Sequence, residues 1–426
     1  MPTILLVGTL DSKGSELCFI QRQIQQLGVC SVLLLDVGRG ANTTPTSNTD
    51  DESNNNTNII TIQPPLYHPP LSRLSRADYI GAVSEYATVQ VTELYHAHRI
   101  HGIVGIGGSC GTNIATTVMR RALPVGFPKL MVSTMASGNV RAYIEETDIT
   151  MMYTVVDIAG TNSILNRILS NAAAAINGMT VSFYSSTQTQ KEKSTLTGPN
   201  LKRIRIGITM FGVTTPAVDR IREYFETHHV NYEVYVFHAT GAGGKAMERL
   251  IRERQLDAVL DLTTTEVVDE LLGGVLSAGT CRLDAAAQTG IPQLVSVGAC
   301  DMINFGPRDE LPSELARRCI YEHNPTVTLV RTTAEESRRV ARWMAGKLRS
   351  AVRPDRVRLL LPVGGVSLLD TPGQPFHDPE ADEALFTTLE AELHGTGIAV
   401  ARHPSSINED FAVAAAQELV RLIAMD

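Results

Sequence analysis

The feature that most constrains the fold is a glycine-rich stretch, residues 101–113, which reads HGIVGIGGSCGTN. Its apolar run 103–106 is short and carries no charge, as expected of a strand that is buried on both faces of a parallel sheet. Gly107, Gly108 and Gly111 follow at once and predict a tight turn. A strand and turn of this kind are typical of an α/β protein, in which a helix follows each parallel strand.

The helix predicted after this turn begins near Ile114, and Thr112 or Asn113 can cap it. The N–H groups at a helix N-terminus and the helix dipole favour negative charge, and glycines let a ligand approach the backbone. Ser109 and Thr112 add hydroxyl groups. The stretch is therefore a candidate phosphate site. A glycine turn that serves only helix packing is an equal alternative, because no short glycine motif is decisive alone.

The length and composition indicate a soluble globular protein with two domains. A chain of 426 residues is longer than one hydrophobic core usually serves. The formal net charge of −8 gives no basic surface for a phosphate backbone, so we expect no nucleic-acid partner. The six cysteines form no CxxC pair and no zinc spacing, which is typical of reduced thiols. No signal peptide and no apolar run of membrane-spanning length is recognisable, so we expect a cytoplasmic protein without a membrane partner.

Alternating apolar runs and amphipathic segments predict an α/β fold of two Rossmann-like subdomains, each an open parallel sheet. We place the first subdomain at 1–184 and the second at 201–426. The polar segment 185–200 is predicted to be the linker between them. Segment 41–58 is rich in Asn, Thr, Ser and Asp, and it is predicted to be a flexible surface insertion.

Local patterns also predict two helices and one loop. A helix is predicted over 163–175, ahead of the linker. The segment 298–307 is predicted to be a loop after a strand. Thr333 opens a T-A-E-E capping box and therefore predicts the start of a helix.

Ligands of such sheets bind at the carboxyl ends of the strands, and the unusual loops of this chain fall at that edge. In the first subdomain the edge would combine hydroxyls, one cation and one carboxylate, a set that suits a phosphorylated ligand. Asp11 could approach a magnesium ion bound to that ligand. The candidate cofactor-binding residues are Gly8, Thr9, Asp11, Lys13, Gly107, Gly108, Ser109, Gly111, Thr112, Ser133, Thr134, Ser137 and Gly138.

A second candidate anion site consists of Gly241, Gly243, Gly244 and Lys245. The segment is similar to a P-loop, but alanines stand at 239 and 246, where that motif needs a glycine and a Ser or Thr. The hydroxyl that would bind magnesium is therefore missing, and we expect at most an anion-binding turn with a lysine as a point charge.

The second subdomain also holds candidate catalytic residues at predicted strand ends: His238, Asp261, Glu266 and Asp301. Histidine and carboxylates at one edge could carry out general acid–base chemistry. Each also has a structural explanation, because isolated histidines mostly serve structure and the segment 263–266 reads as an ordinary helix start.

Seven segments, which run in order through nearly the whole chain, resemble one known family. They are GTLDSKGSE, GIVGIGGSCGTN, STMASGN, GITMFGVTTP, FHATGAGGKAMERL, DLTTTEVVDELLGGV and SVGACDMINFGP. The family comprises the amino-terminal domain of the tomato protein that confers resistance to tomato mosaic virus, with uncharacterised bacterial and fungal relatives. Cys110 stands where these relatives tend to have glycine, and the insertion 41–58 is peculiar to this chain.

The resemblance implies two Rossmann-like subdomains, binding of ATP with Mg²⁺, and self-association into a homodimer or higher homo-oligomer. Many relatives carry a TIM barrel after this region, so a separate TIM-barrel protein is a conceivable partner. Two functions follow. The first is an ATP-binding protein of uncharacterised cellular role. The second is an enzyme that acts on a small phosphorylated or acyl substrate in the cleft between the subdomains.

Overall fold

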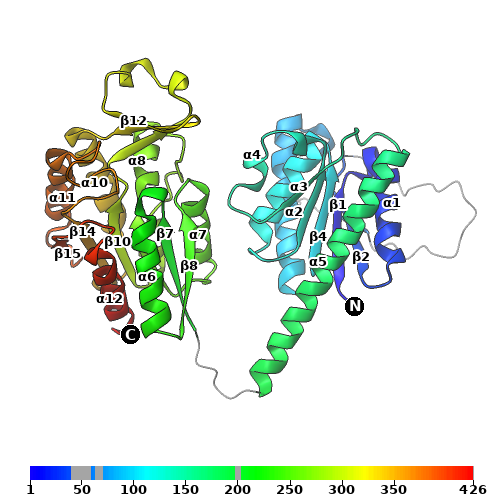
Figure 1. Ribbon diagram of the computed structural model, residues 1–426. Coiled ribbons are helices and arrows are strands. Elements are labelled where there is room, and N and C mark those ends of the chain that lie inside the picture. The colour runs from blue at the N-terminus through cyan, green and yellow to red at the C-terminus, as the bar shows by residue number, and fades with distance from the viewer. Residues whose placement is uncertain (40–58, 63–70, 197–202, 426) are drawn as a thin grey trace, which may run out of the picture. The chain divides into compact units, whose positions relative to one another are not determined.

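The structure, a computed structural model, describes residues 1–39, 59–62, 71–196 and 203–425. The chain divides into two compact units, Met1–Asn200 and Leu201–Asp426, and each is described by itself (Figure 1). Each unit is built on a six-stranded parallel sheet with helices on both faces, which confirms the predicted α/β fold. The predicted insertion 41–58 lies outside the described residues.

The first unit has the strand order β3-β2-β1-β4-β5-β6, and every neighbouring pair is parallel. The strands are β1 (Thr3–Gly8), β2 (Ser31–Asp36), β3 (Ile59–Thr61), β4 (Gly102–Gly107), β5 (Lys129–Ser133) and β6 (Thr150–Tyr153). This is the order of dinucleotide-binding Rossmann folds. The direction of the order reverses between β1 and β4, which makes their carboxyl ends the topological switch point of the sheet.

Helices α1 (Leu10–Gln26) and α5 (Ser163–Leu196) pack on one face of this sheet, and α2 (Arg76–His96) and α3 (Ser109–Ala122) pack on the other. Side chains of β4 enter both cores, because Ile103 joins the core under α2 and α3 while Val104 and Ile106 join the other. The strand predicted over 103–106 is therefore confirmed, with both faces buried. Shorter helical elements are η1 (Leu71–Arg73), η2 (Thr134–Ser137) and α4 (Arg141–Ile144).

Two predictions about helices in the first unit were wrong. Helix α3 begins at Ser109 rather than near Ile114, so Thr112 lies inside its first turn instead of capping it. Helix α5 does not end near residue 175 but continues to Leu196, through most of the predicted linker 185–200. The polar linker-like stretch contains no glycine or proline before Gly198, and its Gln, Lys and Glu residues are good helix formers. The polar composition of the segment 185–200 therefore did not indicate a lack of secondary structure.

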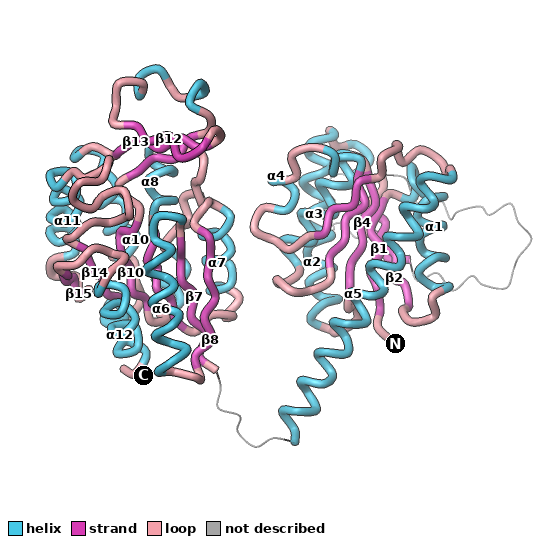
Figure 2. Tube along the Cα trace, viewed as in Figure 1, coloured by secondary structure: helices cyan, strands magenta, loops and turns pink. Residues whose placement is uncertain are grey.

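The second unit has the strand order β15-β14-β10-β9-β7-β8, again all parallel. The strands are β7 (Ile204–Met210), β8 (Tyr232–His238), β9 (Ala258–Thr263), β10 (Gln293–Gly298), β14 (Val357–Pro362) and β15 (Ala399–His403). The order reverses between β7 and β9. Figure 2 shows these strands in magenta between the two layers of helices.

Helices α6 (Thr215–His228) and α12 (Asp410–Ile423) cover one face of the second sheet. The other face packs against α7 (Ala242–Arg252), α8 (Thr265–Leu272), α9 (Asp284–Thr289), α10 (Ala334–Leu348) and α11 (Pro379–Leu393). The remaining short turns are η3 (Gly212–Thr214), η4 (Arg308–Glu310), η5 (Ser313–Leu315) and η6 (Pro354–Arg356). The capping box predicted at Thr333 is confirmed, since Thr333 and Glu336 each bond the other's main-chain N–H at the start of α10.

A small antiparallel sheet extends the second unit. Its strands are β11 (Met302–Phe305), β12 (Ile320–Asn324) and β13 (Val327–Arg331). Strand β11 lies within the segment 298–307 that was predicted to be a loop, because its four residues are buried against the neighbouring core and pair with β13. None of the helices in the described part of the chain has the length and apolar character needed to cross a membrane.

Candidate functional site

The candidate site of the first unit lies at the switch point, at the carboxyl ends of β1 and β4, and Gly108, which follows β4, lies near Thr134 of the η2 turn. The glycines of this site differ in how much space a side chain would have. A Cβ on Gly8 would lie 2.6 Å from a side chain of α1, and a Cβ on Gly107 would lie 2.8 Å from the Cα of Gly111. These glycines let α1 and α3 pack closely on their strands. Gly108 has open space instead, since its Cβ would meet only the hydroxyl of Thr134 at 3.8 Å.

The N-terminus of α3 projects from this edge. Ser109, Cys110 and Gly111 form its first turn, whose N–H groups have no acceptor within the helix. Ser109 is exposed, the residue before it makes no side-chain cap, and no acidic residue lies in the turn. The Nε–H of Arg76, at the start of α2, donates to Cys110 Sγ at 3.0 Å. The positive end of the helix dipole therefore has a cation beside it.

The N-terminus of α1 has negative charge beside it, in contrast to the N-terminus of α3. The carboxylate of Asp36, from the end of β2, accepts the N–H of Leu10 at 3.0 Å and that of Gly38 at 2.9 Å. Asp11, in the first turn of α1, accepts the N–H of Arg39 at 2.9 Å through its Oδ2. Two carboxylates thus lie at this helix end, where the dipole favours them.

Arg39 and Tyr79 link the carboxylate of Asp11, in the first turn of α1, to the start of α2. The Arg39 guanidinium lies 4.4 Å above the ring of Tyr79 and donates to the carbonyl of Ser75 at 3.0 Å. The Tyr79 hydroxyl donates to the carbonyl of Val37. Burial, and after it the charge of Asp11, raises the pKa of Tyr79 to about 12. Arg39 and Arg76 were not among the predicted residues, because neither belongs to a recognisable motif.

Several predicted cofactor-binding residues also make contacts within the unit. Thr112 is buried, and its hydroxyl bonds Ser133 at 2.6 Å and the Gly107 carbonyl at 3.3 Å, so it ties α3 to β4 and β5. The ammonium group of Lys13 donates to the carbonyl of Ile158. The remaining predicted residues of this edge are partly or fully exposed: Thr9, whose hydroxyl bonds Ser12 at 2.6 Å, together with Thr134, Ser137 and Gly138.

The described residues offer no ready-made metal centre, because they contain no group of three or more His, Cys, Asp or Glu side chains that could hold an ion. Asp11 is an exposed carboxylate at the switch point. A single carboxylate is sufficient for a magnesium ion that is already bound to phosphate groups of a ligand. In such sites Mg²⁺ keeps waters and substrate oxygens as its other ligands.

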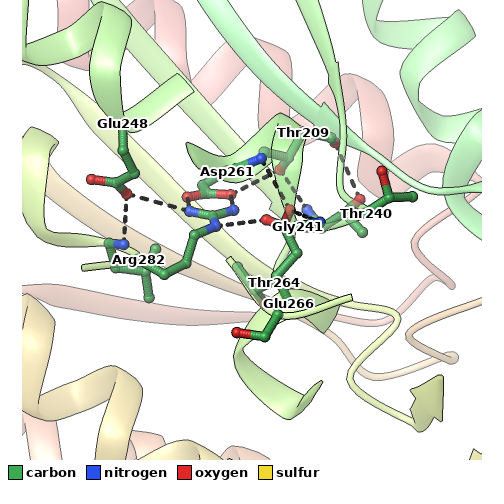
Figure 3. Close-up of polar contacts among 12 residues, drawn as sticks. Thr209, Thr240, Gly241, Glu248, Asp261, Thr264, Glu266 and Arg282 are labelled. Carbon is green, nitrogen blue, oxygen red and sulfur yellow. Dashed lines mark hydrogen bonds and ion pairs between the residues drawn. The ribbon is translucent and has the colours of Figure 1, made fainter. Parts of the chain in front are cut away.

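In the second unit, Asp261 and Glu266 are paired with a buried arginine, Arg282 (Figure 3). The two Nη atoms of Arg282 lie 2.5 and 2.6 Å from the two oxygens of Asp261, and its Nε lies 2.8 Å from Glu266 Oε2. Glu248 lies farther off, 3.6 Å from Arg282 Nη1. Burial alone would lower the pKa of Arg282, but these three carboxylates raise it well above its usual value.

The predicted second anion site is filled by this cluster. The other oxygen of Glu266 accepts the N–H of Gly241 at 2.7 Å and that of Gly244 at 3.0 Å. Gly241 has a φ of 90°, and a Cβ on Gly243 or Gly244 would overlap the His238 carbonyl or the Glu266 carboxylate. The glycines are therefore explained by packing around a carboxylate of the protein itself, which takes two of the N–H groups expected to bind an anion.

The four candidate catalytic residues do not form one constellation. His238 is exposed and stacks on Phe211, with ring centroids 5.8 Å apart. Asp261 and Glu266 are buried against Arg282, as described. Asp301 is buried in a different cluster, where it accepts the Ser367 hydroxyl at 2.7 Å. Burial raises the pKa of Asp301 to about 6.

The Asp301 cluster is centred on Arg331, which sequence reasoning also missed. Arg331 Nη2 lies 2.6 Å from Asp382 and 3.2 Å from Asp370. Three buried carboxyl groups therefore surround one guanidinium. Apolar side chains from β11, β13 and the loops after β7, β10 and β14 pack together beside them: Val213, Ala299, Met302, Leu329, Leu369 and Phe376.

Comparison with known proteins assigns both units to one family. Residues 2–185 match "Uncharacterised protein family (UPF0261) N-terminal domain" and residues 203–423 match the C-terminal domain of the same family. The chain belongs to the UPF0261 family. A UPF0261 protein of Clostridium tetani is 42% identical over 423 residues, which are 99% of this chain and 98% of that protein.

The predicted resemblance is confirmed as well. The tomato (Solanum lycopersicum) ToMV resistance protein Tm-1(GCR237) is 44% identical over 295 residues, which are 69% of this chain and 38% of the tomato protein. Among solved structures, Acinetobacter baumannii MurG matches at 12% identity with a TM-score of 0.25, covering 100% of this chain and 99% of that chain. A likeness this low carries no information on the function of a UPF0261 protein.

Proposed function

We propose that the first unit of this UPF0261 protein binds a nucleotide, ATP with Mg²⁺, and that the phosphates lie on the N-terminus of α3. The observation that carries the proposal is the charge found at this helix end. Carboxylates of the protein occupy the N-termini of α1 and α7, through Asp36 and Glu266. At α3 the same position has no acidic residue in the first turn, and it has Arg76 nearby.

The arrangement at α3 favours an anion, because the positive end of the helix dipole and an exposed arginine lie side by side. Partial positive charge accumulates at a helix N-terminus, and a cation placed there is repelled rather than attracted. Arg76 uses its Nε–H on a thiol, which does not neutralise it. A phosphate group would accept hydrogen bonds from the first-turn N–H groups and pair with the guanidinium at once.

The surrounding residues suit this ligand. Gly108 leaves open space on the backbone at the entrance to α3, and the hydroxyls of Ser109 and Thr134 lie beside it. Asp11, across the switch point, would hold the Mg²⁺ ion that accompanies the phosphates. When bound, that ion supplies charge neutralisation between the phosphate oxygens and the acidic side of the site.

Binding of ATP to purified protein, measured by isothermal titration calorimetry with Mg²⁺ present, tests the proposal. Replacing Arg76 with glutamine removes the phosphate-facing cation and is expected to weaken ATP binding about 10- to 100-fold, the usual value of a hydrogen bond to a charged group. The matched control is Arg121→Gln, which removes an exposed arginine from the opposite, C-terminal turn of the same helix. Equal losses in both variants, or no ATP binding by the unaltered protein, would refute this site.

The alternative function, an enzyme that acts on a small phosphorylated or acyl substrate, remains a hypothesis. The buried state of Asp261, Glu266 and Asp301 does not favour it, since a catalytic acid or base must reach its substrate. Release of phosphate from Mg-ATP by the purified protein would favour it. Homo-oligomerisation and a TIM-barrel partner also remain predictions, and light scattering with and without ATP would test the first of these.

A further inference from the structure

Strand β8 lies at an edge of the second sheet and, within the described part of the chain, pairs with β7 alone (Figure 2). It is seven residues long, and its register with β7 runs without a bulge. None of its residues is buried, and Val236 is 38% exposed. Such an edge offers N–H and C=O groups to any extended chain, so proteins usually shorten it, bend it or place charges on it.

The other edges of the two large sheets are protected in these ways. Strands β3 and β6 have only three and four residues. Strand β15 carries Arg402, whose guanidinium bonds the carboxylates of Glu383 and Glu390. The sequence of β8, YEVYVFH, contains no proline, lysine or arginine, and its valines and aromatic residues favour strand pairing. Strand β8 is therefore a long edge without these protections.

The hydrogen bonds at the two ends of β8 show which of its main-chain groups face outward. The N–H of Ile204 donates to the carbonyl of Asn231 at 3.0 Å, and the N–H of Ala239 donates to the carbonyl of Met210 at 2.7 Å. Alternate residues of a parallel strand face its partner. The odd-numbered residues of β8 therefore face β7, and the main-chain groups of the even-numbered residues point away from it.

The outward groups of β8 form a set that is complementary to itself. The N–H of Tyr232 and the carbonyl of His238 are already bonded within the chain. The donors that are left are the N–H groups of Val234, Val236 and His238, and the acceptors that are left are the carbonyls of Tyr232, Val234 and Val236. No hydrogen bond from elsewhere in the described part of the chain reaches these six groups.

A two-fold axis at Tyr235 pairs the whole set. In an antiparallel pair about this axis, Val234 of one copy lies opposite Val236 of the other, and the two residues exchange N–H···O bonds. The N–H of His238 then faces the carbonyl of Tyr232 at each end. An axis at Val234 or at Val236 leaves donors and acceptors of the edge without partners.

The side chains of β8 are compatible with this axis. Tyr235 meets its own copy there, at a position where the Cα atoms of antiparallel strands lie about 4.5 Å apart and aromatic pairs are favourable. Glu233, the acidic residue of β8, lies opposite Phe237. The two carboxylates of the pair are therefore kept apart, whereas like charges directly opposite each other destabilise a sheet.

We infer that the outer edge of β8 binds a second copy of this chain, antiparallel about a two-fold axis at Tyr235, so that the two sheets become continuous. The resemblance to a known family implies self-association but assigns no surface to it. This interface belongs to the second unit, and it does not depend on binding of ATP at α3.

Oxidative cross-linking of the full chain tests the axis. Tyr235→Cys places two thiols opposite each other, and a Cα separation of about 4.5 Å allows a disulfide. Mild oxidation should therefore give a covalent dimer that the unaltered protein, with its six cysteines, does not give. The matched control is Val236→Cys, at a more exposed position. Its copy lies about 7 Å farther along the partner strand, beyond the reach of a disulfide.

Light scattering tests the interface itself, and the unaltered protein should have twice the mass of one chain. Val236→Pro removes an outward N–H from each copy and leaves the bonds to β7 intact. Loss of these two hydrogen bonds should raise the dissociation constant of the dimer about 10- to 100-fold. Val236→Lys keeps every main-chain group, so it preserves the fold, and it should weaken the dimer by placing charges at the edge. Val352→Lys, at another exposed valine of the second unit, should not.

Three results would overturn the inference. The first is a monomer at high protein concentration. The second is a dimer that Val236→Pro and Val236→Lys leave as tight as before, because its interface must then lie elsewhere. The third is a dimer that Tyr235→Cys does not cross-link, or that Val236→Cys cross-links equally well, because the axis is then not at Tyr235.

Discussion

Replacing Asp370 with asparagine is expected to make the second unit more resistant to unfolding at alkaline pH. The Asp370 side chain is buried, accepts the N–H of Val366 at 2.9 Å, and also bonds Asp382. Burial, reinforced by the charges of Asp301 and Asp382, raises the pKa of Asp370 to about 9. One arginine cannot neutralise three ionised carboxylates, so Asp370 holds a proton at neutral pH.

The direction of the pH effect follows from where that proton is held. The folded state keeps it up to about pH 9, whereas the unfolded chain releases it above its ordinary pKa of 3.8. The contribution of Asp370 to stability is therefore complete below pH 3.8 and is lost as the pH rises toward 9. Because the folded state binds one more proton than the unfolded chain over this range, the unfolding free energy should fall by roughly 3 kcal/mol between pH 6 and 8.

Asparagine resembles the protonated acid but does not titrate. Its oxygen can accept the N–H of Val366 and its amide group can donate to Asp382, so the cluster around Arg331 is preserved. The advantage of Asp370→Asn over the unaltered protein should therefore grow by roughly 3 kcal/mol from pH 6 to pH 8.

The assay is urea unfolding followed by tryptophan fluorescence. The sequence contains one tryptophan, Trp343, which lies in α10 and packs against the core of the second unit. Its signal therefore reports on this unit within the full chain. Asp309→Asn, at an exposed position, is the charge-matched control and should show no such trend. A stability difference for Asp370→Asn that does not change with pH would mean that Asp370 is ionised in the folded state, and the reasoning would fail.

Two further predictions use the same fluorescence assay. Arg282→Met should lower the unfolding free energy of the second unit by about 3–5 kcal/mol, because it leaves Asp261, Glu266 and Glu248 buried without their cation; a loss below 1 kcal/mol would contradict that account. Gly243→Ala should cost about 1–3 kcal/mol, because the added methyl group overlaps the carbonyl of His238 and forces the turn to move. An unchanged urea midpoint would show that the turn adapts freely.

Local patterns in the sequence were sufficient to predict the parallel sheets and the edge at which the loops lie. The run 103–106 is a strand because its side chains are apolar on both faces, and the loops after β1 and β4 meet because parallel strands end at one edge. Helix ends were harder to predict. The stretch after residue 175 was interpreted from its polarity, although nothing in it stops a helix before Gly198.

The contents of the site could be predicted only in part, because they depend on partners distant in sequence. Asp36 caps a helix that begins 26 positions earlier, and Arg282 pairs with an aspartate 21 positions before it. No local spacing reveals which carboxylate will reach which helix end. For the same reason no local pattern indicates Arg39 or Arg76, and none predicts that the ammonium group of Lys13 bonds the carbonyl of Ile158.

The comparison of α1, α3 and α7 changes how a glycine-rich turn before a helix is interpreted. All three helices follow strand ends at the carboxyl edge of a parallel sheet, and the turns before α3 and α7 were both predicted to bind anions. At α7 the glycines make room for Glu266, so the turn already holds its anion. At α3 the glycines make room for the helix itself, and the side chain beside its first turn is an arginine. Glycines indicate that two parts of the chain approach closely, and the charge that the protein supplies at the helix end distinguishes a site for a ligand from one that the protein fills.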